Sequence, residues 1–391
     1  MEALFKKQVI KGKLKTYPTN LTKKDLKKLS KNPFSVVTKK DKNISEIPYN
    51  IYYKNNIKQI INTLNQLEAS FKNKKVWSDY IKTIKRGFLK DAWEDVEKEF
   101  LKMNLNKNEQ FVLNIGPIES VHDSLLGTKK FYTLVFGEVD KQKTEQVNKI
   151  VKNLGIKNTK VLIENILFWS GELKALRASG WSRPENPKLI KNIGTVKQLF
   201  LFNIENKANN LYIPLLKIVN NGKNAKIKNY LKEKYYLNVL FHELGHTIKK
   251  PKDAQTRLGK YYNGVEEARA EIQSYNIALD QGDKINLDIE SFIITSLITF
   301  AHMHWIYKNK NIRKPYSQGA KILWSFAEKH KHIYIKNKQL EFKDTKKLAL
   351  KMQHYVQNIA ESKEEKDIKK IIKEPKTLTF ITNWINKNQN A

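Results

Sequence analysis

The chain has 391 residues, of which 40% are hydrophobic and 10% aromatic, so its composition excludes a disordered protein and suits two lobes better than one core. It contains no cysteine, which excludes disulfides and thiolate chemistry. The formal net charge is +34, but the lysines that cause it are spread along the whole chain. Such spreading favours a solvated surface over a dedicated nucleic-acid face.

The first part of the chain is predicted to be helical. Apolar residues at helical spacing indicate helices over 58–71 and 76–89, and a third helix is expected to begin near Asp91 as its N-cap. The first 30 or so residues are rich in lysine and weakly patterned, so we expect a flexible lead-in. Met1 to Asn20 contains no apolar stretch of the kind that a secretory signal needs, which predicts a cytoplasmic protein.

The pattern then changes to strands, which are predicted over 111–115, 131–136, 198–204 and 211–219. Between the first two lies a segment over 115–123 that contains Gly116 and Pro117 and is predicted to be a loop. A loop placed by two strands is a common location for binding residues, although an ordinary turn fits the same pattern. A helix is expected over 143–154, and glycines and prolines over 170–196 predict an irregular connection.

The remainder of the chain is predicted to be almost wholly helical. The longest apolar run there, Ile293 to Ala301, is too short to span a bilayer, so no membrane partner is expected. The predicted helices cover residues 226–249, 264–281, 288–308, 317–332 and 345–360.

The sequence Phe241-His242-Glu243-Leu244-Gly245-His246 lies in the first of these helices and contains an H-E-x-x-H motif. Residues i and i+4 share one helix face, so His242 and His246 can direct two imidazole nitrogens at one ion. Zinc in a catalytic site takes three protein ligands and keeps an open position for water. Glu243 is then placed to take a proton from that water as a general base.

A second acidic segment follows about twenty residues after His246. Its carboxylates include Glu266, Glu267 and Glu271, at the separation that thermolysin-like peptidases use for a third zinc ligand. Glu267 and Glu271 share a helix face, so one can bind the metal while the other supports a ligand histidine. The alternative is that these acids merely solvate the start of a helix.

These two motifs together resemble those of the dipeptidyl peptidase III family. Glu266-Glu267-Ala268-Arg269-Ala270-Glu271 is similar to its E-E-C-R-A-E signature, and His242 to His246 resembles its H-E-L-L-G-H motif, shortened by one residue. Further similarities appear in Gly116-Pro117-Ile118-Glu119-Ser120, in Ala301-His302-Met303 and near Pro33. The resemblance covers roughly residues 30–360.

The resemblance implies a set of roles for individual residues. His242, His246 and Glu267 would bind one zinc ion, Glu243 would be the general base, and Glu266 and Glu271 would support the ligands. Glu119 would hold the free N-terminal ammonium of the substrate by charge-assisted hydrogen bonds. Asn210 would grip the peptide backbone, and His302 would stabilise the oxyanion. From its pattern alone, His302 on an apolar helix is more often a core histidine.

Two positions depart from the family pattern. Val121 stands where the family has a tyrosine that donates to the reacting carbonyl, and valine cannot donate. The segment around Asn210 keeps only the first asparagine of the family's N-x-P-N sequence. Zinc binding and water activation are therefore expected to be retained, while the grip on the substrate is expected to differ.

The sequence therefore predicts an α+β protein, predominantly α, with two lobes and a wide cleft. Residues 1–145 with 191–223 would form a mixed lobe with a small sheet or barrel, 146–190 with 224–355 a helical zinc-bearing lobe, and 356–391 a helical tail. The predicted activity is a zinc-dependent exopeptidase that releases dipeptides or short N-terminal fragments from oligopeptides. We expect a monomer with no specific nucleic-acid partner.

Three alternatives remain open on the sequence alone. One is a zinc aminopeptidase or oligopeptidase without dipeptide preference. A second is a zinc-retaining peptide-binding protein that does not hydrolyse, for which Val121 and the altered segment at Asn210 argue. The third is a basic nucleic-acid-binding protein, but the sequence contains no zinc finger, RNA-recognition motif or phosphate-binding loop to support it.

Overall fold

The computed structural model describes the chain in two compact units, Met1–Phe202 and Asn203–Ala391. Residues 9, 10, 13, 14, 23, 26, 106, 119–123, 127, 128 and 187 are described by their backbone alone. The expectation of a flexible lead-in falls in part outside the described residues. The described residues are 9–10, 13–14, 18, 20–30, 32–106, 109–123, 127–170, 178–184, 186–220, 222, 224–248, 251–311 and 313–388.

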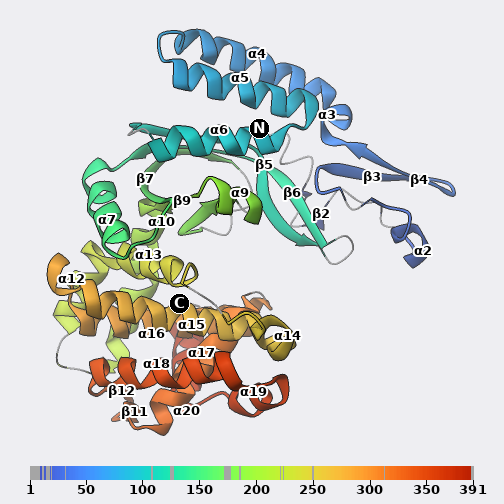
Figure 1. The fold of residues 1–391 in the computed structure, drawn as a ribbon. Helices are drawn as coiled ribbons and strands as arrows, with labels where there is room; N and C mark the ends of the chain where they lie inside the picture. The colour runs from blue at the N-terminus through green and yellow to red at the C-terminus, as the bar shows by residue number, and fades with distance from the viewer. Residues whose placement is uncertain are drawn as a thin grey trace. The chain divides into compact units, whose positions relative to one another are not determined.

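The first unit combines helices with a five-stranded sheet. Its helices are α2 (Lys23–Leu26), α3 (Tyr49–Tyr52), α4 (Lys54–Ser70), α5 (Lys75–Lys90), α6 (Trp93–Asn106), α7 (Lys141–Asn153), α9 (Pro187–Asn192) and the start of α10 (Leu201–Lys207). Short hairpins β1 (Val9–Ile10) with β2 (Lys13–Leu14) and β3 (Ser35–Lys40) with β4 (Asn43–Pro48) precede the sheet. Helices α4 and α5 pack side by side (Figure 1).

Two predicted boundaries in this unit are corrected. Asp91 was expected to cap the start of α6, but it adopts a left-handed conformation with φ of 54° and ends α5. The loop predicted over 115–123 is part of one long strand. That strand is irregular between Gly116 and Glu119, where Gly116 has φ of 136° and a Cβ there would lie 2.5 Å from the Trp93 ring. Glycine is needed at this irregularity because Trp93 packs on the backbone.

The main sheet has the order β5-β6-β7-β9-β8. Its strands are β5 (Phe111–Asp123), β6 (Gly127–Val139), β7 (Thr159–Ser170), β8 (Gly180–Arg183) and β9 (Thr195–Phe200). Strands β7 and β9 are parallel and the other pairs are antiparallel. One face packs against α5 and α6 over buried aromatic rings that include Tyr80, Phe88, Trp93, Phe100 and Tyr132.

The sheet pairing changes the predicted domain boundaries. We expected 146–190 to belong with the zinc-bearing helices, but β7 and β8 hydrogen-bond into the sheet of the first unit. Residues 203–223 were expected in the mixed lobe, and they lie in the second unit. Pairing between strands far apart in the chain decides this assignment, and local pattern does not show it.

The second unit is nearly all helical, as predicted. The helices are α11 (Ile213–Leu215), α12 (Asn224–Glu233), α13 (Tyr235–Gly245), α14 (Ala254–Leu258), α15 (Tyr262–Gln281), α16 (Ile289–Lys310), α17 (Lys314–Lys329), α18 (Thr345–Ser362), α19 (Glu365–Ile371) and α20 (Lys376–Asn388). Single-turn elements are η1 (Ala208–Tyr212), η2 (Leu216–Ile218), η3 (Gly259–Tyr261) and η4 (Asp283–Ile285). A small sheet joins β10 (Val219–Asn220), β11 (Ile333–Lys336) and β12 (Gln339–Phe342).

Two further predictions in this unit are corrected. The strand expected over 211–219 is a π-helical turn followed by short helices, with only Val219–Asn220 extended. The predicted C-terminal tail is part of the core, since α20 packs on α16 and α17 and Thr377 donates its backbone N–H to Glu328. In the apolar run over 211–219, packing among the surrounding helices outweighed the β propensity of the residues.

Helix α16 is the central element of this unit. Of the described residues, it alone forms a helix long and apolar enough to cross a membrane, and 72% of the qualifying window is buried. It packs against α12, α13, α15, α17, α18 and α20. Its apolar character is that of a helix surrounded by other helices.

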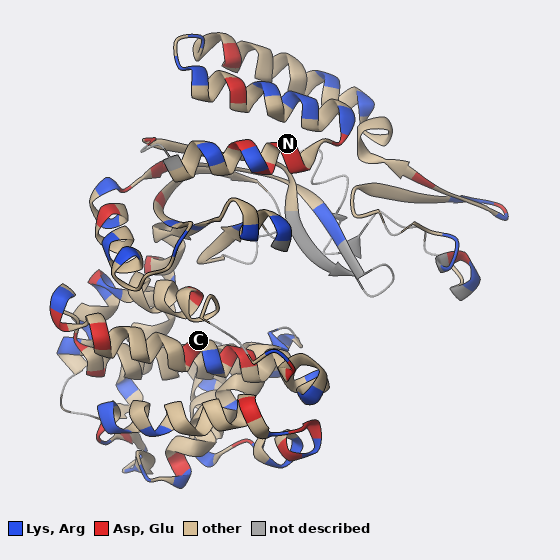
Figure 2. Ribbon diagram, viewed as in Figure 1, with Lys and Arg blue, Asp and Glu red and all other residues tan. Residues whose placement is uncertain are grey.

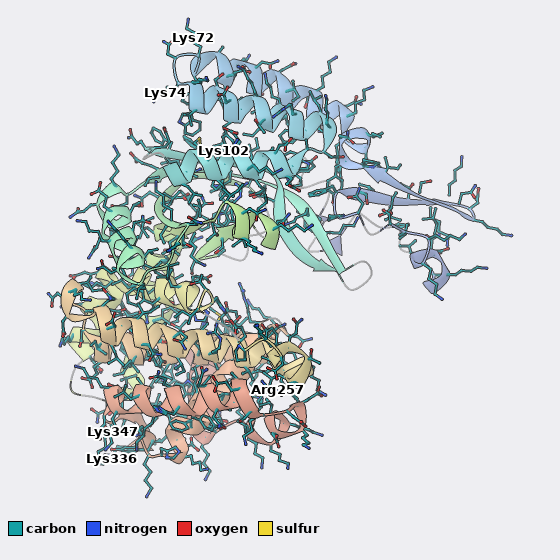
Figure 3. The ribbon with its side chains drawn as sticks, in the orientation of Figure 1. Lys72, Lys74, Lys102, Arg257, Lys336 and Lys347 are labelled. Carbon is teal, nitrogen blue, oxygen red and sulfur yellow. The ribbon has the colours of Figure 1, made fainter. Side chains whose placement is uncertain are left out.

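Basic side chains are distributed over both units, as Figure 2 shows. Lys72 and Lys336 are exposed, and their side chains point away from the ribbon (Figure 3). Among the described residues, Lys98 and Lys102 form ion pairs with glutamates of their own helix, α6. This distribution agrees with lysines that act mainly as a solvated surface.

Candidate metal centre

The candidate site is built on the close contact between α13 and α15. The run Tyr235 to Phe241 is apolar and helix-compatible, and α13 buries nearly all of its length. Gly245 is required where the two helices approach, because a Cβ there would lie 2.2 Å from the carbonyl oxygen of Ala270. This approach brings the His242 and His246 turn against the acidic turn of α15.

His242, His246 and Glu267 converge as the spacing predicted. One ligand atom from each lies within 4.8 Å of the other two. An Oε2 atom of Glu267 is 3.1 Å from Nε2 of His242 and 3.6 Å from Nε2 of His246. Ligand atoms around a tetrahedral zinc ion are about 3.3 Å apart, given bonds of 2.0–2.1 Å. The two distances to Glu267 are close to this separation, and all three atoms are near enough to reach one ion.

The outer nitrogens of both histidines are held by carboxylates. Nδ1 of His242 is 2.8 Å from Glu271, and Nδ1 of His246 is 3.0 Å from Glu266. With Nδ1 donating a hydrogen bond, the Nε2 lone pair of each ring is left to face the ion. Glu271 and Glu266, which were expected to support the ligands, thus each accept a hydrogen bond from one histidine.

These supporting carboxylates are themselves fixed. Arg269 donates to both oxygens of Glu266, at 2.7 and 2.9 Å, and to the carbonyl of Gly245 at 3.1 Å. Glu271 accepts hydrogen bonds from Ser274 and Ser296. Because Arg269 is only 2% exposed, its guanidinium ties the two helices together inside the core.

The electrostatics favour a divalent cation in this group. Glu266, Glu267 and Glu271 carry three negative charges, and Arg269 offsets one of them. Burial opposes the charged form of Glu267, but hydrogen bonds from His242 and His246 outweigh it and lower the pKa of Glu267 to about 2. Burial likewise opposes a charged His242, and the hydrogen bonds to Glu267 and Glu271 raise the pKa of His242 well above its usual value. A metal ion would compete with protons for these atoms.

The donor set fits zinc. Two imidazole nitrogens and one carboxylate oxygen are ligands that zinc accepts, with a fourth position left for water or substrate. Glu243 follows His242 in α13 and is half-buried. The charge of Glu243 affects the pKa of Tyr316, and so does the charge of the proposed ligand Glu267. Glu243 and Glu267 therefore both lie near the Tyr316 side chain.

Three other predicted site residues are not joined to this group by any described contact. His302 is buried on α16, where its ring centroid lies 5.8 Å from that of Tyr212 and 5.5 Å from that of Trp305. Burial lowers the pKa of His302, and the positive charges of Lys207 and Lys310 lower it further, to about 4. Its predicted role at the oxyanion stays a prediction.

Asn210 is exposed in the π-helical turn η1. Irregular turns of this kind are frequent at functional sites, but no contact of Asn210 bears on its predicted grip of the substrate. Glu119 and Val121 lie on β5 in the first unit, and their side chains are outside the described atoms. The predicted roles at these positions therefore remain predictions.

The sequence did not point to Tyr316 or Phe300. The Tyr316 ring centroid lies 6.0 Å from that of His242, and Phe300 approaches His242 at 5.8 Å. Neither residue belongs to a recognisable motif. Their position follows from the packing of α16 and α17 on α15, which only the tertiary structure shows.

Comparison with solved structures identifies the fold. The structure of DPP III from Caldithrix abyssi matches with a TM-score of 0.83 and 16% identity, covering 95% of this chain and 78% of that one. Dipeptidyl-peptidase III from Corallococcus sp. strain EGB matches with a TM-score of 0.69 and 15% identity, covering 95% and 76%. No family model and no curated protein matches the sequence. The chain therefore has the fold seen in the dipeptidyl peptidase III structures.

Proposed function

We propose that this protein is a zinc-dependent exopeptidase that removes dipeptides or short fragments from the N-terminus of oligopeptides. The observation that carries the proposal is the convergence of His242, His246 and Glu267, each histidine backed by its own carboxylate. The fold supports it, because the DPP III structures from Caldithrix abyssi and Corallococcus share it. The H-E-x-x-H spacing supports it independently.

In this proposal the side chains have distinct tasks. His242, His246 and Glu267 would hold a zinc ion, which supplies Lewis-acid activation of water and of the scissile carbonyl. Glu243 accepts the proton of the attacking water and then donates it to the leaving amine. Glu266 and Glu271 hold the histidine rings in the tautomer that leaves Nε2 unprotonated.

The first test replaces Glu243 by glutamine. This change removes the base but keeps the size and polarity of the side chain. We expect hydrolysis of peptides to fall by at least about a hundredfold, while one equivalent of zinc is retained. Peptide cleavage is followed by mass spectrometry, and zinc is measured by elemental analysis.

The matched control is Glu233→Gln, an exposed glutamate at the end of α12. Its activity and zinc content should equal those of the wild type. Unchanged turnover in Glu243→Gln would rule out the assigned base. A wild-type protein that binds zinc but cleaves no peptide would favour the non-hydrolytic peptide-binding alternative.

The second test concerns the length of the released fragment. Arylamides of one, two and three residues are compared with the zinc-loaded enzyme. Release from the two-residue substrate supports the dipeptidyl assignment. Release of single residues only would favour an aminopeptidase.

A further inference from the structure

Tyr316 is the third residue of α17 and is half-buried beside the histidine pair. Its ring is 6.0 Å from His242 at an interplanar angle of 31°, and 5.9 Å from Phe300. Phe300 in turn meets His242 edge-on at 5.8 Å. The Tyr316 side chain is therefore packed directly on a proposed zinc ligand.

The helix that carries Tyr316 is fixed against the acidic helix. A Cβ on Gly319 would lie 3.3 Å from Cβ of Glu267 and 3.3 Å from the backbone nitrogen of Ala268. A Cβ on Gly264 of α15 would lie 2.4 Å from Cβ of Gln318. Residues three apart share a helix face, so Tyr316 lies one turn from the contact at Glu267, on the same side of α17.

The charges around the phenol belong to the same site. Glu267 and Glu243 both act on the Tyr316 phenol through their charges. The proposed ligand and the proposed base are thus both neighbours of this side chain. A phenol ordinarily titrates near pH 10, so at neutral pH it is protonated and can donate a hydrogen bond.

The hydroxyl of Tyr316 makes no hydrogen bond with the part of the chain that the structure describes. Tyr230 and Tyr235 of the same unit do, with Asn238 and with Thr299 at 3.3 Å, whereas the buried Tyr212 hydroxyl has no partner among the described residues either. The Tyr316 hydroxyl is not among the buried polar atoms without a partner, so it is open to solvent. A hydroxyl that lacks a protein partner beside a metal centre is available to a ligand.

We propose that the Tyr316 hydroxyl is a catalytic hydrogen-bond donor to the oxygen of the scissile carbonyl. The proposal rests on the peptidase function proposed above and deepens it. It assigns to α17 the task that the resemblance gave to His302 and to a tyrosine at position 121. His302 makes no hydrogen bond, ion pair or ring contact with His242, His246 or Glu267 among the described residues, and position 121 is valine.

The chemistry is a change of hydrogen-bond strength without proton transfer. As water attacks the carbonyl carbon, the C=O π electrons move onto the oxygen, which becomes negatively charged. A neutral phenol then donates a stronger, charge-assisted hydrogen bond to that oxygen than to the ground-state carbonyl. The donor therefore acts on kcat more than on KM.

The test is Tyr316→Phe in the zinc-loaded enzyme. The phenyl ring keeps the packing on His242 and Phe300 and removes only the donor. We expect kcat for a peptide substrate to fall about 100- to 1000-fold, with KM within about twofold of the wild type and one zinc ion retained. A merely structural tyrosine predicts near-wild-type kcat.

The control is Tyr334→Phe on β11, which removes a hydroxyl from an exposed tyrosine of the same unit. Its kinetics and zinc content should match the wild type. A Tyr316→Phe protein with wild-type kcat would overturn the proposal. So would one that loses zinc, because the tyrosine would then act on the metal centre and not on the substrate.

A second readout separates this proposal from the peptidase function. Binding of a phosphinic peptide, whose tetrahedral P–O⁻ group mimics the oxyanion, is measured by calorimetry. Tyr316→Phe should weaken this binding at least about tenfold. An ordinary amide peptide is not cleaved by Glu243→Gln, and its affinity for that variant should not change when Tyr316→Phe is added. Equal affinity for the phosphinic peptide would overturn the role of Tyr316. Absence of hydrolysis by the wild type would instead overturn the peptidase function.

Discussion

Glu271 shows how a residue outside the proposed ligand set can control the metal. Its carboxylate lies 2.8 Å from Nδ1 of His242 and is held in turn by Ser274 and Ser296. A carboxylate in this position fixes the ring orientation and increases the basicity of the opposite nitrogen.

Replacing Glu271 by glutamine should therefore weaken zinc affinity about 10- to 100-fold, because the amide is a poorer acceptor for the imidazole N–H. The affinity is measured by competition with a chromophoric chelator. Glu205→Gln, at an exposed position of α10, serves as the control and should leave the affinity unchanged. Wild-type affinity in Glu271→Gln would contradict the supporting role.

At the scale of elements, the site depends on how closely α13 and α15 approach. Gly245 allows this approach, since the carbonyl of Ala270 lies where a Cβ would be. Gly245→Ala should force the helices apart and cost about 1–3 kcal/mol of stability, with weaker zinc binding. Urea unfolding and zinc titration measure the two effects.

The control for this change is Gly155→Ala. No atom lies within 4 Å of a Cβ there, but φ is 67°, so only backbone strain of about 1 kcal/mol is expected and zinc binding should not change. If Gly245→Ala were no worse than the control in both measurements, the close approach would not be what positions the ligands.

In the first unit, the sheet contains a buried carboxyl group on β7. Burial raises the pKa of Glu164 to about 8, against the smaller lowering by its hydrogen bond from Gln198. The unfolded value is about 4.3, so the folded state binds this proton more tightly. The contribution of Glu164 to stability is complete below the unfolded pKa and is lost as pH rises through about 8.

We therefore expect the urea midpoint of the first unit to fall from about pH 5 to about pH 8 and to level off above that. Glu164→Gln should flatten this dependence because the amide does not ionise. Tryptophan fluorescence at a series of pH values measures the midpoint. Glu138→Gln, at a partly exposed position of the neighbouring strand β6, should keep the wild-type slope. An equal slope in Glu164→Gln would show that other groups cause the pH dependence.

At the scale of the whole molecule, the division into two compact units predicts two responses to metal. The proposed ligands all belong to the unit 203–391. Zinc at a hundred times its dissociation constant should stabilise that unit by about 2.7 kcal/mol, which raises its Tm by roughly 5–10 °C. The unit 1–202 should not respond.

Differential scanning calorimetry with and without a chelator measures these transitions. His246→Ala should abolish the shift of the second unit and leave the transition of the first unchanged. A zinc-dependent shift of equal size in both transitions would contradict a metal site confined to the helical unit.

The sequence by itself determined the helical class of the second unit and the convergence of three ligand atoms. Both depend on geometry over short stretches of chain: a 3.6-residue period places His242 and His246 one turn apart, and a connection that includes α14 and η3 returns the chain to Glu267. The resemblance in these motifs also anticipated the fold that the solved structures share.

Only the tertiary structure decided which segments share a sheet and which rings surround the histidines. The strands over 159–170 and 180–183 belong to the first unit because of hydrogen bonds to strands far along the chain. Tyr316 meets His242 because α17 packs on α15 at Gly319 and Gly264. Contacts of this kind depend on side-chain volumes on several helices at once, and a one-dimensional pattern does not contain them.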